Sequence, residues 1–322
     1  MPLLIGLHAL KQEVIDRMPL RRIGGGWALD GGGNARGVNA IDLQTSRASA
    51  DQVASGDDSF IGGGQNNTAS GVRSAVFGGI NNRTIGQDAI IFSGEDNYAY
   101  GNNSIILAGN NNNNYGTNAI ICAGSYNTIS TSNYTFIGAG THNLIAANGS
   151  FIGAGSYNTA GALYTSILAG LQGFADKRGQ TVKSSFCFAA QGDAQSSLPL
   201  VAGCITANNT PEELFLDGDG GSARCIIASD TTWMFHINVV ARRTDADNES
   251  AAYNFLGCID NNAGTTALVG SVTKTVVAED TSAWDCNVTE DNANGALIIT
   301  ATGENAKTIQ WVASIFLTET TG

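Results

Sequence analysis

The most regular feature of this chain is an apolar position that returns every 15 or 16 residues through its middle third. Counted from a start at Ser59, the third residue of each of eight copies is apolar: Ile61, Val76, Ile91, Ile106, Ile121, Ile137, Ile152 and, with the last copy started at Ser166, Leu168. The sixth residue is glycine in the first seven copies. The ninth residue is asparagine in the same seven: Asn67, Asn82, Asn97, Asn112, Asn127, Asn143 and Asn158. A short fixed period of this kind indicates a repeat architecture.

This repeat predicts a β-solenoid in which each copy forms one coil. Every copy carries a run of three or four small or apolar β-forming residues, too short for a helix, followed by glycine and a polar turn rich in asparagine. Glycine and asparagine tolerate positive φ, so the chain can turn sharply twice per coil without strain at Cβ. We expect the apolar third residues to stack as an interior ladder. The asparagines should form a second ladder, with amides hydrogen-bonded from coil to coil.

The pattern on either side of the repeats predicts three regions: an N-terminal attachment segment and linker (1–50), the solenoid shaft (51–204) and a C-terminal domain (205–322). Before Pro19, four apolar residues have the spacing of one face of a short helix: Leu7, Leu10, Val14 and Met18. This helix would pack on copies of itself or insert into a larger assembly, and both alternatives stay open.

The C-terminal region has alternating strands separated by turns. The expected strands are 213–216, 223–228, 232–242, 251–259, 268–277, 285–289, 296–301 and 308–317. Eight such strands predict an antiparallel β-sandwich of the jelly-roll type. With a period of two, Trp233, Phe235 and Ile237 share the inner face, while His236 lies on the other face, where we expect a chain interface.

Composition narrows the function classes. Only 14% of the residues are charged, against ~25% in an ordinary globular domain. The net charge is −12, and 16 acidic and 5 basic residues lie from Pro211 onward. An acidic surface disfavours nucleic acid. Six widely spaced cysteines without a Cys-x-x-Cys pair favour neither zinc nor a disulfide framework, and no metal or cofactor is expected. No apolar run is long enough for membrane insertion.

A coil of 15 residues is thin, and this bears on the oligomeric state. Each coil offers two or three buried side chains, whereas ordering the backbone costs about 1–2 kcal/mol per residue. Packing several chains side by side would supply the missing burial. We therefore expect a homo-oligomer, and specifically a homotrimer.

Five short segments and the repeat itself resemble known fibre proteins. Residues 36–47 (RGVNAIDLQTSR), 52–56 (QVASG) and 67–71 (NTASG) resemble the lead-in and repeats of bacteriophage tail-fibre and related virion proteins. The repeat also resembles the head repeats of trimeric autotransporter adhesins, which form trimeric β-rolls. Residues 240–245 (VARRTD) and 260–266 (DNNAGTT) resemble the C-terminal domain of phage structural proteins. Unlike the adhesins, the sequence shows no signal peptide or membrane anchor, so we expect a virion component synthesised in the host cytoplasm.

The resemblance implies a trimeric tail fibre that is not an enzyme. Its N-terminus would attach to other tail or capsid proteins, through Leu7, Leu10, Val14 and Met18. Its C-terminal domain would bind a glycan or protein of the host surface. Because sugars stack on exposed aromatic rings, Trp284 and Tyr253 are the candidate receptor-binding residues, with burial in the core as the alternative.

Two other functions remain as alternatives. A head or collar fibre, or a decoration protein, would have the same architecture without a receptor. A tailspike that cleaves polysaccharide would need two carboxylates about 5–9.5 Å apart. The repeats offer Asp88, Glu95 and Asp96, which lie in turns and are poorly placed for such a pair. Asp245, Asp247 and Glu249 could bind calcium, but the rest of an EF-hand loop is missing, and a charged turn between two strands is the alternative.

Overall fold

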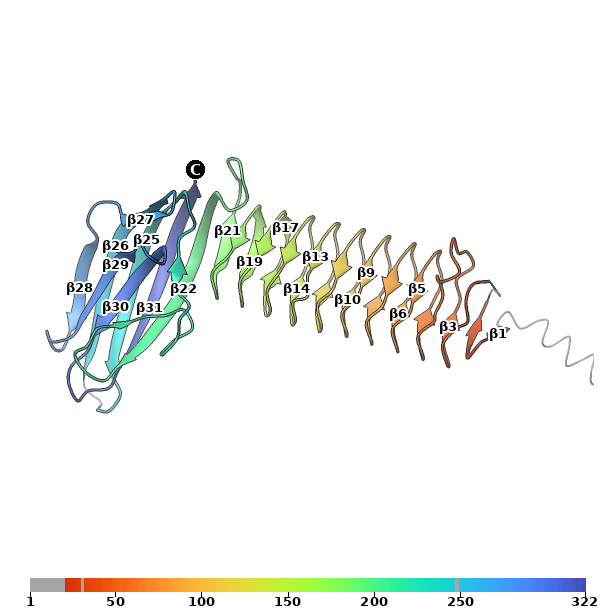
Figure 1. Ribbon diagram of the computed structural model, residues 1–322, viewed down its shortest axis with the longest axis horizontal. Helices are drawn as coiled ribbons and strands as arrows, with labels where there is room; N and C mark the ends of the chain where they lie inside the picture. The colour runs from red at the N-terminus through yellow and green to blue at the C-terminus, as the bar shows by residue number, and fades with distance from the viewer. Residues whose placement is uncertain (1–20, 30–31, 247–248) are drawn as a thin grey trace, which may run out of the picture. The chain divides into compact units, whose positions relative to one another are not determined.

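The computed structural model describes residues 21–29, 32–246 and 249–322, and this part of the chain contains strands and no helix (Figure 1). The all-β prediction, a solenoid followed by antiparallel sheets, is confirmed. The expected N-terminal helix around Leu7, Leu10, Val14 and Met18 lies outside the described residues. Among the residues described, no helix is long and apolar enough to cross a membrane. The chain divides into two compact units, Met1–His142 and Asn143–Gly322.

In the first unit, each coil contributes one short strand to each of two parallel sheets. The first sheet holds β3 (Ile41–Asp42), β4 (Phe60–Ile61), β6 (Ala75–Val76), β8 (Ile90–Ile91), β10 (Ile105–Ile106), β12 (Ile120–Ile121) and β14 (Phe136–Ile137). The second holds β5 (Thr68–Ala69), β7 (Arg83–Thr84), β9 (Tyr98–Ala99), β11 (Asn113–Asn114) and β13 (Thr128–Ile129). The coil before them adds β1 (Arg21–Ile23) and β2 (Gly26–Ala28). Equivalent residues pair in register, for example Ile105 with Ile120.

The second unit begins with further coils of the same kind. Its first sheet holds β16 (Phe151–Ile152), β17 (Gly155–Ser156), β19 (Ser166–Leu171) and β21 (Thr181–Ser184). Its second sheet holds β15 (Leu144–Ile145), β18 (Thr159–Ala160) and β20 (Phe174–Ala175). In all, the solenoid makes about ten coils.

The apolar ladder lies where the sequence places it, inside the coils. Its first seven members are completely buried: Ile61, Val76, Ile91, Ile106, Ile121, Ile137 and Ile152. The eighth member was assigned wrongly. Ile152 pairs with Ile167, which is buried, whereas Leu168 is 59% exposed. The last copy therefore starts at Thr165 and not at Ser166, so the copy before it has 15 residues.

The asparagine ladder is also confirmed and leaves few polar atoms unpaired. The Asn97 amide nitrogen Nδ2 donates to Asn82 Oδ1 at 3.0 Å and to the carbonyl oxygen of Gly109 at 2.9 Å. Asn97 Oδ1 accepts in turn from the backbone nitrogen and from Nδ2 of Asn112, at 3.1 and 3.0 Å. In the second unit, Asn158 Nδ2 donates to Asn143 Oδ1 at 2.9 Å. Each side chain thus bonds to the coils before and after it.

The turns explain the glycine of the repeat. Gly79 has φ = 93°, and a Cβ built on it would lie 2.2 Å from the carbonyl oxygen of Gly94 in the next coil. A side chain at this position would therefore push two coils apart. The eighth residue of each coil also has positive φ without being glycine: Asn66, Asn81, Asp96, Asn111, Tyr126, His142, Tyr157 and Gln172, with φ from 53° to 58°.

In the first unit, the ladders start from polar residues. Asp42 pairs with Ile61 and so occupies the ladder position of the coil before it. Its carboxylate is completely buried and forms ion pairs with Arg36 Nε and Arg47 Nη2, both at 3.0 Å. Gln44 takes the place of the preceding asparagine, since its Oε1 accepts from the backbone nitrogen of Asn67 at 2.8 Å. The start of both ladders is therefore closed by hydrogen-bonded side chains.

The last coil, in the second unit, ends in the same way. Gln180 Oε1 accepts from the backbone nitrogens of Asp176 and Lys177, at 2.9 and 3.1 Å. The buried Lys177 ammonium lies 3.4 Å from Glu319 Oε2 and 2.7 Å from Asp176 Oδ1. Burial alone lowers the pKa of Lys177, but the carboxylates of Glu319 and Asp176 outweigh it and raise the pKa above the usual value.

Two antiparallel sheets pack face to face in the C-terminal part of the second unit. The large sheet has the order β22 (Ala194–Thr206), β31 (Ile309–Thr321), β25 (Thr231–Arg243) and β26 (Ser250–Asn262), with β27 (Thr265–Leu268) and β28 (Thr273–Glu279) both paired to β26. In the small sheet, β30 (Ala296–Thr302) pairs with β29 (Asp285–Asp291), β23 (Glu212–Glu213) and β24 (Cys225–Ile226).

This arrangement moves one expected boundary and splits one expected strand. Residue 204, the expected end of the shaft, falls inside β22, which pairs with β31 along most of its length. The sandwich therefore begins at Ala194. The strand expected over 268–277 is two strands, β27 and β28. As expected, Trp233, Phe235 and Ile237 face the core, and His236 faces away from it.

The glycine turn gives a direct test with two neighbouring residues. We predict that Gly79→Ala lowers the thermal midpoint sharply, because the backbone strain alone costs about 1–3 kcal/mol and the Gly94 carbonyl must also move. Gly78 is the matched control, since a Cβ there meets nothing within 4 Å. Thermal unfolding followed by circular dichroism should show Gly78→Ala near the wild type. Equal midpoints for the two variants would contradict the close approach.

Candidate functional site

The two aromatic residues expected at the receptor surface lie in the sandwich core. Trp284 and Tyr253 are each 1% exposed, and Trp284 packs against Trp311 with ring centroids 5.9 Å apart. The Tyr253 hydroxyl donates to the backbone oxygen of Trp284 at 3.2 Å, and burial raises its pKa well above the usual value. Because neither ring face is accessible, the expectation that these two side chains are exposed is wrong.

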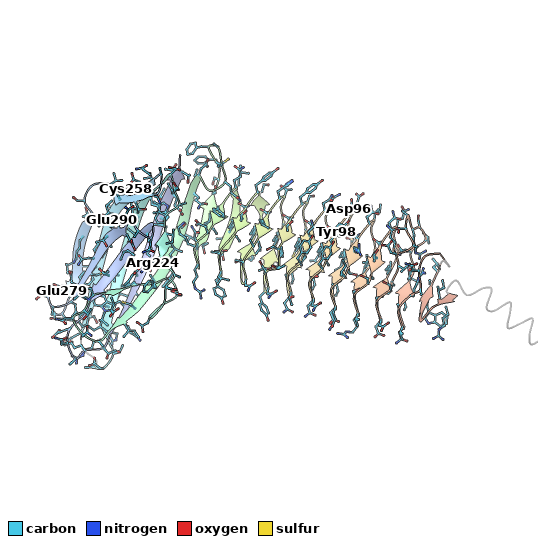
Figure 2. All side chains as sticks on the ribbon, viewed as in Figure 1. Asp96, Tyr98, Arg224, Cys258, Glu279 and Glu290 are labelled. Carbon is cyan, nitrogen blue, oxygen red and sulfur yellow. The ribbon has the colours of Figure 1, made fainter. Side chains whose placement is uncertain are left out.

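Two carboxylates of the coil region, Asp88 and Asp51, have pKa values below the usual range. Asp88 is paired with Arg73 in the coil before it, at 2.7 Å, and these hydrogen bonds hold its pKa below the usual range. Asp96, labelled in Figure 2, shares a polar hollow of about 370 Å³ with Asp51. The Ser49 hydroxyl donates to Asp51 and also lowers the pKa of that carboxyl. A general acid needs the opposite shift.

The acidic turn considered for calcium is an ion-pair network. Arg243 bridges Asp245 and Glu249, with nitrogen–oxygen distances of 2.8 and 2.9 Å, and Lys307 reaches Glu249 at 2.7 Å. The Arg243 side chain holds the pKa of Asp245 at about 2. Within the described ranges, no group of three or more His, Cys, Asp or Glu side chains is arranged to hold a metal ion.

The coils of the first unit carry an apolar strip on their outer surface. We define this outer apolar strip by Phe77, Phe92 and Leu107, the fourth residues of successive coils, which are 48%, 44% and 39% exposed. Phe77 and Phe92 stack with centroids 4.9 Å apart and an interplanar angle of 8°. A ladder of large apolar side chains in water is typical of a protein interface.

The large sheet of the sandwich has a second exposed apolar surface. Six residues on its outer face are between 38% and 58% exposed: Val201, Met234, Val240, Leu256, Val312 and Phe316. His236 lies among them, with Asn254 Nδ2 2.6 Å from its Nε2 and the Phe316 ring centroid 5.8 Å from its own. We call this the outer sheet face. His236 thus lies on the outer face of the sheet, and the chain interface expected there stays a prediction.

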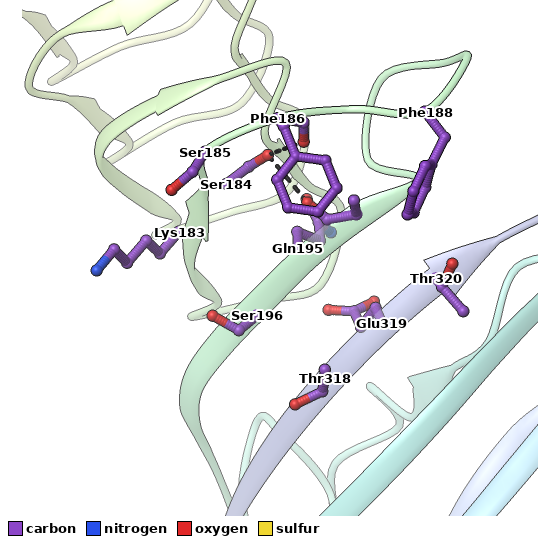
Figure 3. Close-up of a pocket in the computed structure, with 11 residues that line it drawn as sticks. Lys183, Ser184, Ser185, Phe186, Phe188, Gln195, Ser196, Thr318, Glu319 and Thr320 are labelled. Carbon is purple, nitrogen blue, oxygen red and sulfur yellow. Dashed lines mark hydrogen bonds between the residues drawn. The ribbon is translucent and has the colours of Figure 1, made fainter.

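A cavity of about 470 Å³ lies between the last coil and the ends of β22 and β31, all within the second unit (Figure 3). Phe186 and Phe188 form its upper wall and are 54% and 72% exposed, with the two rings edge to face at 5.3 Å. Its remaining lining is mostly polar: Lys183, Ser184, Ser185, Gln195, Ser196, Thr318, Glu319 and Thr320, with Ala194. Sequence reasoning missed this site. The available signal was a Phe-Cys-Phe segment between polar residues.

The loop that carries these phenylalanines is fixed by buried polar groups. The Asp193 carboxylate accepts hydrogen bonds from the backbone nitrogens of Ala190, Ala189 and Phe188, and the bond from Ala190 is the main cause that holds its pKa below the usual range. The Ser184 hydroxyl lies 3.0 Å from the carbonyl oxygen of Phe186 and 3.0 Å from that of Ala194. The loop is thus held in one conformation although its aromatic rings face water.

The comparisons with known proteins give weak similarities only. No protein-family model matches the chain, and no curated protein matches it. Among solved structures, it is similar to the tailspike protein gp49 of the Acinetobacter baumannii bacteriophage Fri1, a capsular polysaccharide depolymerase, with 8% identity and a TM-score of 0.22 over 86% of this chain. The chain spans 60% of the length of that protein.

Two further tailspikes give comparable values. The Acinetobacter baumannii phage AM24 tailspike has 9% identity and a TM-score of 0.22, with 87% of this chain and 67% of that chain covered. The Acinetobacter phage vB_ApiP_P1 tailspike has 8% identity and a TM-score of 0.19, with 90% and 73% covered. At this level of similarity, function does not transfer from these proteins to this chain.

The buried position of Trp284 generates a prediction. Trp284→Ala should lower the free energy of unfolding by about 3–5 kcal/mol, as expected when a large core side chain is removed. Trp27→Ala is the matched control, because Trp27 is 45% exposed and should change stability little. Urea unfolding of both variants distinguishes the two positions. A stable, fully folded Trp284→Ala protein would mean that this side chain is not part of the core.

Proposed function

We propose that this chain is the structural fibre protein of a bacteriophage virion, a homotrimer that attaches to other virion proteins through its N-terminal segment and to the host surface through its C-terminal region. The observation that carries the proposal is the pair of apolar surfaces that one chain leaves in water, the outer apolar strip and the outer sheet face. Identical chains that pack these surfaces together would bury them in both units.

The coil interior supports the same conclusion. Within one chain, isoleucines fill the interior of each coil and asparagines form its hydrogen bonds. The exposed phenylalanines of the strip are therefore not part of the coil interior. Their ladder is the additional burial that a thin solenoid obtains from association. A tail fibre is the role that the sequence resemblance favours. A head or collar fibre that binds no receptor is the alternative.

We propose further that the protein is not an enzyme. The lowered pKa values of Asp51 and Asp88 fit carboxylates that accept hydrogen bonds, not a general acid that protonates a glycosidic oxygen. Incubation with capsular polysaccharide from the host strain, followed by a reducing-sugar assay, should give the same signal as buffer. Release of reducing ends would overturn this part of the proposal.

The trimer gives the first test. Light scattering after gel filtration should yield a mass of about 100 kDa, three times 33.2 kDa. Phe92→Glu should shift the mass toward the monomer, because three carboxylates would be buried against apolar side chains. Thr131→Glu adds the same charge at an exposed position outside the strip and serves as the control. A wild-type monomer of 33 kDa would overturn the trimer.

The place of the protein on the virion needs a separate experiment. Antibodies raised against the purified chain should label the tails of intact particles in negative-stain electron microscopy, and they should reduce adsorption of the phage to host cells. Label on capsids, with normal adsorption, would favour the head fibre. Particles without any label would overturn the assignment to the virion.

A further inference from the structure

We propose that the cavity under the Phe186–Phe188 loop is a saccharide-binding site that takes one or two sugar rings of a surface glycan. This inference rests on the proposed function, because it names the receptor class and the residues that would contact it. It replaces Trp284 and Tyr253, whose rings are buried, with an aromatic pair that is accessible in the second unit.

The loop that carries Phe186 and Phe188 exposes two aromatic rings to water, which is unfavourable. Two phenylalanines exposed to water give up the free energy of burial, and such exposure is normally avoided or serves binding. Here the loop cannot turn them inward, since Asp193 fixes the backbone at Phe188, Ala189 and Ala190 with hydrogen bonds of 2.5 to 2.9 Å. Gly192 adds a backbone bond of 2.8 Å to Gln172. The rings are therefore held ready for a ligand, which limits the entropy lost on binding.

The size of the cavity and the residues that line it fit a sugar ring. Its volume of about 470 Å³ lies within the usual range for small-ligand sites. One wall is aromatic, while the opposite side presents hydroxyl groups from Ser196, Thr318 and Thr320. A sugar ring has matching surfaces, because its C–H groups pack against an aromatic face while its hydroxyls form hydrogen bonds at the edge. Lys183 also lines the cavity, but its side chain points away from the two rings (Figure 3).

The structure also disfavours other ligands at this cavity. A peptide that binds as an added strand needs a free sheet edge. At Ser196 and Ser197, however, β22 is already paired on both sides, with Lys183 and Val182 of β21 and with β31. Nucleic acid needs a basic surface, whereas the lining of the cavity has one basic residue, Lys183, and one acidic residue, Glu319.

The tyrosines of the coils are weaker candidates for the same role. Tyr100 and Tyr115 stack on each other with centroids 4.5 Å apart and an interplanar angle of 10°. Tyr98 stacks on Tyr100 at 6.0 Å. In such a ladder each ring covers one face of its neighbour, so less ring face is left for a sugar. Phe186 and Phe188 meet edge to face at 84°, which leaves ring face exposed.

The test uses the full-length protein on an array of bacterial surface glycans, with neutral and uronic-acid-containing oligosaccharides. The wild type should bind a subset of the glycans, and the double variant Phe186→Ala/Phe188→Ala should lose about ten-fold or more in apparent affinity for that subset. Tyr134→Ala, which removes a 73% exposed aromatic ring elsewhere, is the control and should bind like the wild type.

The oligomeric mass of each variant, measured in parallel, separates the outcomes. The inference is overturned if the wild type binds no glycan, or if the double variant binds as well as the wild type. A double variant that no longer forms the wild-type oligomer would also overturn it, because the loop would then be a subunit contact. In the first two cases a wild-type mass near three chains and labelled virions leave the proposed fibre function intact.

Discussion

The close stacking of one coil on the next is the constraint on which the rest of the structure depends. Parallel strands lie about 4.8 Å apart, and at this distance the sixth residue of each coil has no room for Cβ. Backbone groups of this turn point into the coil and need hydrogen-bond partners there. The asparagine three residues later supplies them, as Asn97 does by bonding to Asn82, Gly109 and Asn112. The remaining interior is so narrow that isoleucine, valine and alanine fill it.

A ladder built in this way has open ends, and the chain closes them with charge. In the first unit Asp42 interrupts the apolar ladder, and the coil of β2 still stacks on it, with Ala28 opposite Asp42. The buried pairs of Asp42 with Arg36 and of Lys177 with Glu319 contribute little net stability, because desolvation offsets much of their attraction. These ion pairs matter for the structure because of where they lie. Asp42 lies where the isoleucine ladder begins, after the coil of β2, and Lys177 lies in the last coil, whose strand β21 pairs with β22.

The sequence was sufficient where local physics decides the structure. Each ladder position is fixed by its own coil, so Ile61 through Ile152 and the asparagines were predictable from the period. Leu168 was misplaced because Ile167 and Leu168 offer two apolar residues in succession, and only the hydrogen bonds to Phe151 and Ile152 select between them. The burial of Trp284 depends on Trp311, which is distant in sequence. The Phe186 loop depends on Asp193, whose role is visible only once the backbone is folded around it.

The distribution of charge follows from the same stacking. A charged residue repeated at one position of every coil would face its copies at about 5 Å, and like charges at that distance repel. Between Ser59 and Ala175 there are accordingly only five charged side chains, and Arg73 and Asp88 compensate each other. Amides and hydroxyls keep the coils soluble, and the sandwich carries most of the negative charge. Because the coils carry so little charge, their phenylalanine strip would meet little electrostatic opposition in the proposed trimer. The acidic sandwich would associate through its apolar outer sheet face.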